Sequence, residues 1–70
     1  SDGPQVGQLV VCVREFVPED PTSQLGASPG ERFVVISVDA DAGILELSPE
    51  GDLDVRGFIP VEYVQTAENL

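Results

Sequence analysis

Three acidic side chains in the middle of the chain have the spacing of a calcium-binding loop. Asp39, Asp41 and Glu50 fall at positions one, three and twelve of such a loop, where carboxylates bind Ca²⁺. The loop also requires a glycine at its sixth position and a side-chain oxygen at its fifth, but these positions hold Ile44 and Gly43. No helical pattern flanks the segment. We therefore expect no calcium site, and no other pattern in the chain predicts a cofactor or metal.

The other groups suited to catalysis are few. The chain contains no histidine and no lysine. Glu19 and Asp20 are adjacent acids that would point apart on an exposed segment and remain solvated. Cys12 lies within the apolar run LVVCV, where a free thiol usually behaves as a small buried hydrophobe. The sequence therefore predicts a protein that is not an enzyme.

The charge of the chain restricts its partners. Thirteen acidic residues and three arginines give a net charge of -10, which repels the phosphates of nucleic acids and of anionic lipids. We expect neither nucleic acid nor a membrane surface as a partner. The same charge favours a basic protein or peptide.

Length and composition indicate one small ordered domain. Seventy residues bury a small core, and 41% apolar residues with seven glycines and six prolines are typical of a folded, loop-rich chain. A single cysteine, without a leader or a long apolar run, predicts a soluble, cytoplasmic location. We assign residues 8–66 to the domain and residues 1–7 and 67–70 to linkers of a longer protein.

Short Val- and Ile-rich stretches separated by proline and glycine predict an all-β fold with antiparallel neighbours. The expected strands are residues 9–16, 32–39, 43–49, 54–60 and 63–65. The first two are joined by a long irregular hairpin arm, and the third and fourth by a turn through Gly51. Pro60 should end the fourth strand and open one turn of 3₁₀ helix that returns Val64 to the interior.

Period-two counting along these strands places nine residues on the inward face. They are Val10, Cys12, Leu25, Ala27, Phe33, Val35, Leu47, Ile59 and Val64.

The end of the chain carries a motif of a known family. Residues 57–64 read GFIPVEYV, and this stretch resembles the closing motif of Src-homology-3 (SH3) domains: glycine, aromatic, aliphatic, proline, two variable residues, tyrosine, valine. Upstream, CVREF (12–16) is similar to the family's opening Ala-Leu-Tyr-Asp-Tyr. Leu25 and Ala27 match its leucine pair, and GERFVVI matches its Gly-Asp followed by alternating aliphatics.

The resemblance covers residues 8–66 and implies a small five-stranded SH3-like barrel with a long first hairpin arm and one short 3₁₀ turn before the last strand. SH3 domains bind proline-rich segments in the polyproline II conformation between aromatic rings. By resemblance, the groove positions in this sequence are held by Phe16, Phe58, Pro60 and Tyr63. The alternative is that Phe16 and Phe58 only shield the end of the barrel.

Three positions depart from the family pattern. Arg14 stands where the opening motif has its first tyrosine, Ile44 where a tryptophan usually follows the loop between the second and third strands, and Glu62 where an asparagine is frequent. Tryptophan is the commonest hot-spot residue, and a hot spot contributes about 2 kcal/mol or more. Ordinary binding of proline-rich peptides should therefore be weak or absent.

Acidic residues remain at the expected rim, and in the family such acids pair with an arginine or lysine of the ligand. They are Glu19, Asp20, Asp39, Asp41 and Glu62. Arg14 would either contact the ligand or close the groove by pairing with Glu62 or Glu15.

The leading expectation is a monomeric, non-catalytic interaction module of a signalling, scaffold or cytoskeletal protein. It would recruit a proline-containing or basic peptide through Arg14, Ile44 and the aromatic and acidic residues above. The alternative is a structural or autoregulatory module that packs on another domain through a different surface.

Overall fold

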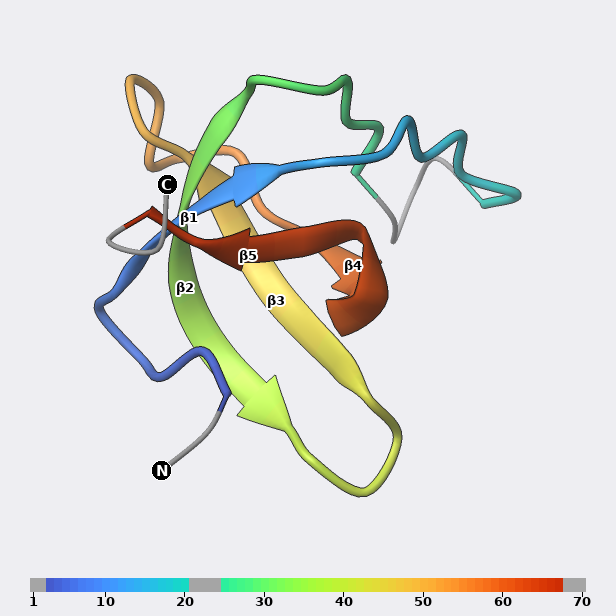
Figure 1. Ribbon diagram of the computed structural model, residues 1–70. Helices are drawn as coiled ribbons and strands as arrows, with labels where there is room; N and C mark the ends of the chain where they lie inside the picture. The colour runs from blue at the N-terminus through green and yellow to red at the C-terminus, as the bar shows by residue number, and fades with distance from the viewer. Residues whose placement is uncertain (1–2, 21–24, 68–70) are drawn as a thin grey trace.

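The computed structural model of the chain describes residues 3–20 and 25–67 (Figure 1). Its elements are β1 (Leu9–Cys12), β2 (Arg32–Asp39), β3 (Ile44–Pro49), β4 (Gly57–Pro60), the 3₁₀ helix η1 (Val61–Tyr63) and β5 (Val64–Thr66). The strands form one antiparallel sheet in the order β4-β3-β2-β1-β5. This confirms the predicted all-β class, and the compact arrangement is consistent with an SH3-like barrel. None of the described residues belongs to a helix long and apolar enough to cross a membrane.

Three strands are shorter than predicted, and β3 differs by one residue only, because it begins at Ile44 instead of residue 43. β1 ends at Cys12 instead of residue 16, because the chain then leaves the sheet to form the arm, where Phe16 and Ala27 make an isolated antiparallel bridge. β4 begins at Gly57 instead of residue 54, because Val55 belongs to a turn in which its N–H donates to the Asp52 carbonyl at 3.2 Å. In both cases the segment contains apolar residues that lie outside the ladder. The prediction counted these residues as part of the strand, so the predicted strands were too long.

The C-terminal segment follows the prediction closely. Pro60 is the last residue of β4 and the N-cap of η1, and its φ of -59° and ψ of 142° are extended. A proline has no N–H to continue the ladder, so the chain turns at this point. After the single turn of η1, Val64 enters β5 opposite Cys12 and is buried.

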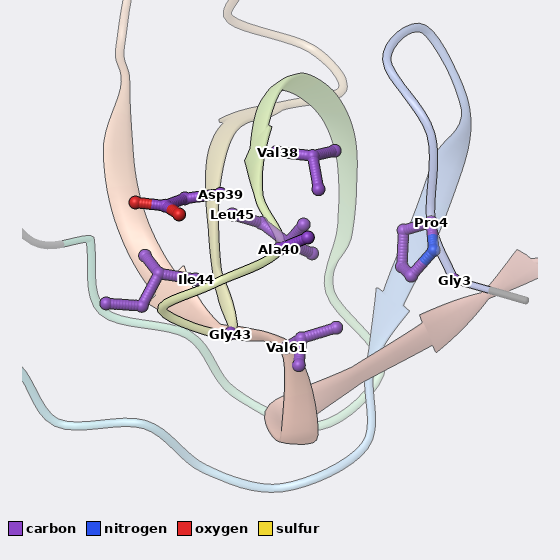
Figure 2. Close-up of a pocket in the computed structure, with 9 residues that line it drawn as sticks. All are labelled: Gly3, Pro4, Val38, Asp39, Ala40, Gly43, Ile44, Leu45 and Val61. Atoms are coloured by element: carbon purple, nitrogen blue, oxygen red, sulfur yellow. The ribbon is translucent and has the colours of Figure 1, made fainter.

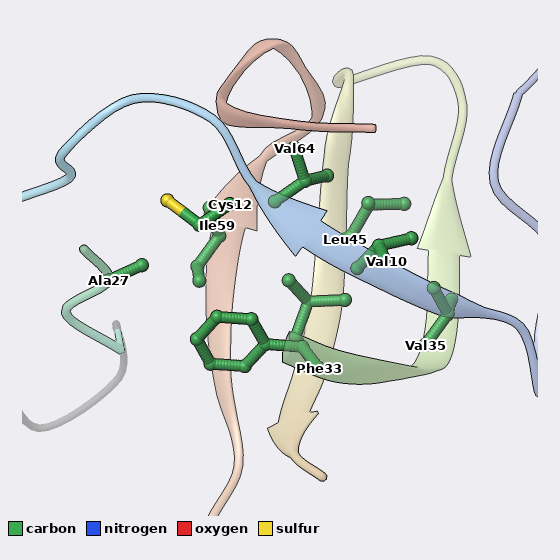
Figure 3. Packing of buried hydrophobic residues seen from close by; sticks show 9 residues of the cluster. Val10, Cys12, Ala27, Phe33, Val35, Leu45, Ile59 and Val64 are labelled. Carbon is green, nitrogen blue, oxygen red and sulfur yellow. The ribbon is translucent and has the colours of Figure 1, made fainter. Parts of the chain in front are cut away.

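The buried residues form one cluster between the curved faces of the sheet (Figure 3). It consists of Val10, Cys12, Ala27, Phe33, Val35, Leu45, Leu47, Ile59 and Val64. The prediction included Leu25, which is only partly buried and packs against the cluster from the arm, and it omitted Leu45. Leu45 lies two residues before Leu47 and opposite Ile59, so strand alternation itself places it inside.

A buried serine organises the connection from β3 to β4. Ser48 is fully buried, and its hydroxyl donates to the carbonyl of Val55 at 2.6 Å and lies 3.1 Å from that of Asp52. The predicted turn through Gly51 is present, with the Asp52 N–H donating to the Pro49 carbonyl at 3.0 Å. Gly51 does not have a positive φ, so this turn does not depend on glycine.

The loop between β2 and β3 does depend on a glycine. Gly43 has a φ of +68°, and its N–H donates to the Asp39 carbonyl at 2.9 Å. The Asp39 carboxylate accepts the N–H of Ala42 at 3.2 Å, which closes the loop from within. The Gly43 carbonyl in turn accepts the N–H of Val61 at 2.9 Å, so this loop is tied to the first residue of η1.

Candidate functional site

An aromatic pair joins the arm to η1. The rings of Phe16 and Tyr63 meet edge to face, with centroids 5.0 Å apart and planes at 62°. Phe16 is held on the arm by two backbone hydrogen bonds with Ala27, at 2.8 and 3.0 Å. Tyr63 ends η1, and its carbonyl accepts the N–H of Val13 at 2.8 Å. Both rings are half-buried, so part of each ring surface stays exposed.

Arg14 lies over one ring of this pair, that of Tyr63. The Cζ of its guanidinium lies 4.8 Å from the centroid of the Tyr63 ring, within the range of a cation–π contact. One guanidinium nitrogen lies 3.6 Å from a carboxylate oxygen of Glu62. Of the two acidic partners considered for Arg14, the structure therefore shows Glu62. The side chains are 59% and 65% exposed, so water screens the pair and its contribution is about 0–1 kcal/mol.

The second half of the candidate site lies on the outer face of β3 and β4. Ile44 is directly opposite Pro60, and Phe58 is opposite Glu46 in the next outward-facing row. Ile44 and Pro60 are partly buried, whereas Phe58 is 42% exposed. Ile44 occupies the position expected for a tryptophan, and its aliphatic side chain offers a smaller wall to a ligand.

The acidic residues divide into two groups. Asp39 is opposite Ile44 across β2 and β3, so Asp39, Ile44 and Pro60 form one row. Asp41 is exposed in the loop that follows. Glu19 and Asp20 are exposed on the arm, next to residues 21–24, which lie outside the described part of the chain.

These residues form a strip with an acid at one end and an arginine paired with Glu62 at the other, and we call it the groove strip. Asp39 stands at one end, Pro60 and the turn of η1 lie in the middle, and Tyr63 with Arg14 stands at the other end. The structure thus brings together Arg14, Phe16 and Tyr63 as one cluster and Asp39, Ile44 and Pro60 as another. The backbone of η1 connects them.

An apolar hollow of about 140 Å³ lies beside the same loop, and its lining includes Asp39 and Ile44 of the groove strip (Figure 2). Val38, Ala40 and Val61 line it together with Pro4 from the segment predicted as a linker. Asp39 is also among the residues that line it, but its carboxylate points away from Val38 and Pro4 (Figure 2). Sequence reasoning missed this hollow, because alternation from Phe33 and Val35 would turn Val38 outward. The register shift between Val35 and Ser37 instead places Val38 opposite the buried Leu45.

The structure adds little chemistry beyond binding. Cys12 is buried, and its thiol donates to the carbonyl of Arg14 at 2.7 Å, so it supports the start of the arm. Within residues 3–20 and 25–67, no three His, Cys, Asp or Glu side chains gather closely enough to hold a metal ion.

Comparison of the sequence with models of protein families and with curated proteins gave no match.

Proposed function

We propose that the chain is an SH3-like interaction module that binds a proline-containing, basic peptide along the groove strip. The observation that carries this proposal is the edge-to-face pair of Phe16 and Tyr63 beside the row of Pro60, Ile44 and Asp39. A peptide in the polyproline II conformation is already extended and loses little entropy when it docks on such rings. We place the module in a signalling, scaffold or cytoskeletal protein of the cytoplasm, without catalytic activity.

The carboxylates at one end supply the preference for a basic ligand. Asp39 directs one oxygen to the N–H of Ala42, which orients the carboxylate and leaves its second oxygen for a ligand arginine or lysine. Asp41 is exposed on the same loop. The net charge of -10 draws cationic segments toward the domain at low ionic strength. Binding should therefore weaken as salt is added.

Affinity is limited by Ile44. A tryptophan at a hot spot contributes about 2 kcal/mol or more, which corresponds to roughly thirtyfold in Kd. An aliphatic side chain recovers part of this by apolar contact, so we expect a dissociation constant in the upper micromolar to millimolar range. Ile44→Trp should strengthen binding by about tenfold, whereas Val6→Trp, at a residue that is 66% exposed outside the groove strip, should leave it unchanged.

The test is an NMR titration of the labelled domain with proline-rich peptides with and without arginine. We expect salt-sensitive shifts at Phe16, Asp39, Ile44 and Tyr63 for the arginine peptides. Asp39→Asn keeps the oxygen that accepts the Ala42 N–H but removes the charge, so it should abolish the preference for arginine without disturbing the loop. No shift in these residues at millimolar peptide would refute the proposal.

One observation favours the alternative role of a structural or autoregulatory module. The hollow lined by Val38 and Val61 is apolar, and the carboxylate of Asp39 points away from Val38 (Figure 2). A neighbouring domain that packs there would protect the amides of residues 38–45 from hydrogen exchange in the parent protein but not in the isolated domain. Equal protection in both would eliminate this role.

A further inference from the structure

Arg14 is the cation that the structure brings to the groove strip. The chain has three arginines. Arg32 pairs with Glu50 at 3.1 Å near the β3–β4 turn, and Arg56 is exposed just before β4, at the opposite end of that strand from Pro60. Of these three arginines, only Arg14 makes a cation–π contact with the aromatic pair within the described residues.

The guanidinium of Arg14 is held in place by one ring and makes one weak ion pair. The ring of Tyr63 fixes one face of the group, at 4.8 Å from its centroid. Its only described ion pair is the contact of 3.6 Å with Glu62, which is longer than a charge-assisted hydrogen bond of about 2.7–2.9 Å. A guanidinium has five N–H donors in a planar fork that matches a carboxylate. Most of this donor capacity is therefore available to a ligand.

The position of Arg14 also determines where a ligand carboxylate would sit. Arg14 is at the Tyr63 end of the groove strip, and Asp39 is at the Pro60 and Ile44 end. A peptide that places a basic residue at Asp39 and extends over Pro60 would present its other end to Arg14. Polyproline II rises about 3.1 Å per residue, so a few residues separate the two charges of such a peptide.

We propose that Arg14 is a specificity-determining residue that binds an aspartate or glutamate of the ligand and exchanges Glu62 for it. The preferred partner is then a proline-containing segment with a basic residue at one end and an acidic residue at the other. This inference rests on the proposed function, because it needs a peptide in the groove strip. The inference adds a preference for an acidic residue in the ligand, which the negative charge of the acidic rim alone would disfavour.

The exchange is favourable because the two carboxylates differ in geometry. The Glu62 carboxylate makes one long contact from the turn of η1, whereas a ligand carboxylate can approach the fork with two parallel hydrogen bonds. Repulsion from the other acids is largely screened beyond a Debye length of about 8 Å at physiological salt. We expect the ligand carboxylate to strengthen binding about three- to tenfold.

The experiment measures Kd by NMR titration for peptides with the same proline core and four end compositions: neutral, arginine only, glutamate only, and both. The doubly charged peptide is made in both orders of the charges, because the direction of the chain in the groove strip is one of the results. Glutamate is replaced by glutamine in the matched peptides, so that length and hydrogen-bonding capacity stay constant.

Three protein variants complete the test. Arg14→Gln should remove the gain from the ligand glutamate, and Arg56→Gln is the control with the same change in net charge at the far end of β4. Glu62→Gln removes the competing carboxylate, so it should increase the gain from the ligand glutamate by about twofold or more. All three positions are exposed, so none of the variants should impair folding.

The outcomes separate the two proposals. A glutamate gain that is lost in Arg14→Gln but retained in Arg56→Gln supports the inference. If the arginine-only peptide binds at the groove strip but glutamate adds nothing in either order, the role of Arg14 is refuted and the proposed function stands. If no peptide binds in the groove strip, both are refuted.

Discussion

Replacing the buried Ser48 of β3 should destabilise the domain more than the loss of an exposed hydroxyl would. The hydroxyl of Ser48 is fully buried, and its donation to the Val55 carbonyl at 2.6 Å holds the segment that delivers β4 to the sheet. We consider Ser48→Ala, which removes one oxygen and leaves the backbone able to keep its extended conformation. The variant therefore isolates the hydrogen bond.

The expected loss of stability follows from the two carbonyls near the Ser48 hydroxyl, those of Val55 and Asp52. A hydrogen bond contributes about 0.5–1.5 kcal/mol net, and an acceptor left buried without a partner costs about 1–3 kcal/mol. Val55 is 40% exposed, so water can reach part of this turn and the full penalty does not apply. We expect a loss of about 1–2 kcal/mol. For a domain of 60–100 residues, each kcal/mol corresponds to about 4–8 °C in Tm.

The assay is thermal unfolding followed by circular dichroism, with Ser37→Ala as the matched control. The Ser37 hydroxyl donates to a carboxylate oxygen of Glu46 at 3.2 Å on the exposed face, so its loss should change stability by less than about 0.5 kcal/mol. The amide of Val55, which donates to the Asp52 carbonyl, should exchange faster with solvent only in Ser48→Ala. Equal shifts in Tm for the two variants would show that the buried hydroxyl does not hold the turn.

Two further pairs of substitutions test the core and a loop. Leu45→Ala should lower the free energy of unfolding by about 2–5 kcal/mol in urea denaturation, because Leu45 is 1% exposed. Leu25→Ala should lower it clearly less, because Leu25 is only partly buried. Similar losses for the two variants would contradict this assignment of the core. Gly43→Ala should cost about 1–2 kcal/mol, because its φ of +68° strains an L residue although the nearest atom, of Val61, is 4.0 Å from the added Cβ. Gly51→Ala, without a positive φ or a neighbour within 4 Å, should be neutral in the same assay, and a comparable loss at both glycines would refute the backbone explanation.

The fold was largely predictable because local chemistry and strand alternation agree over most of the chain. Pro60 ends β4 because a proline has no N–H to continue the ladder, which is a property of that residue alone. Val64 is buried, as predicted from period-two counting and the short 3₁₀ turn. The errors occur where tertiary contacts decide. β1 ends early because the next residues pair with η1 and the arm, and no property of residues 13–16 alone distinguishes that arrangement from a longer strand.

The sequence suggested members for the candidate site but not their geometry. The resemblance to SH3 domains suggested Phe16, Pro60 and Tyr63, yet neither their contacts nor the connection through η1 could be deduced from spacing. The hollow beside Val38 depends on how the loop between β2 and β3 and the N-terminal segment approach η1, which is a property of the assembled fold.

Arg14 shows how the two kinds of information combine. From the sequence it was a departure from a family pattern, with two opposite interpretations: a plug that closes the groove or a contact for the ligand. The structure shows a stack on Tyr63 and a pair with Glu62, which at first favours the plug. However, a plug must be costly to remove. The exposed ion pair of 3.6 Å contributes about 0–1 kcal/mol, and an exposed cation–π contact contributes about 0.5–1 kcal/mol. These weak contacts support our proposal that Arg14 stays over the ring and exchanges Glu62 for a carboxylate of the ligand, as a residue that selects its ligand should.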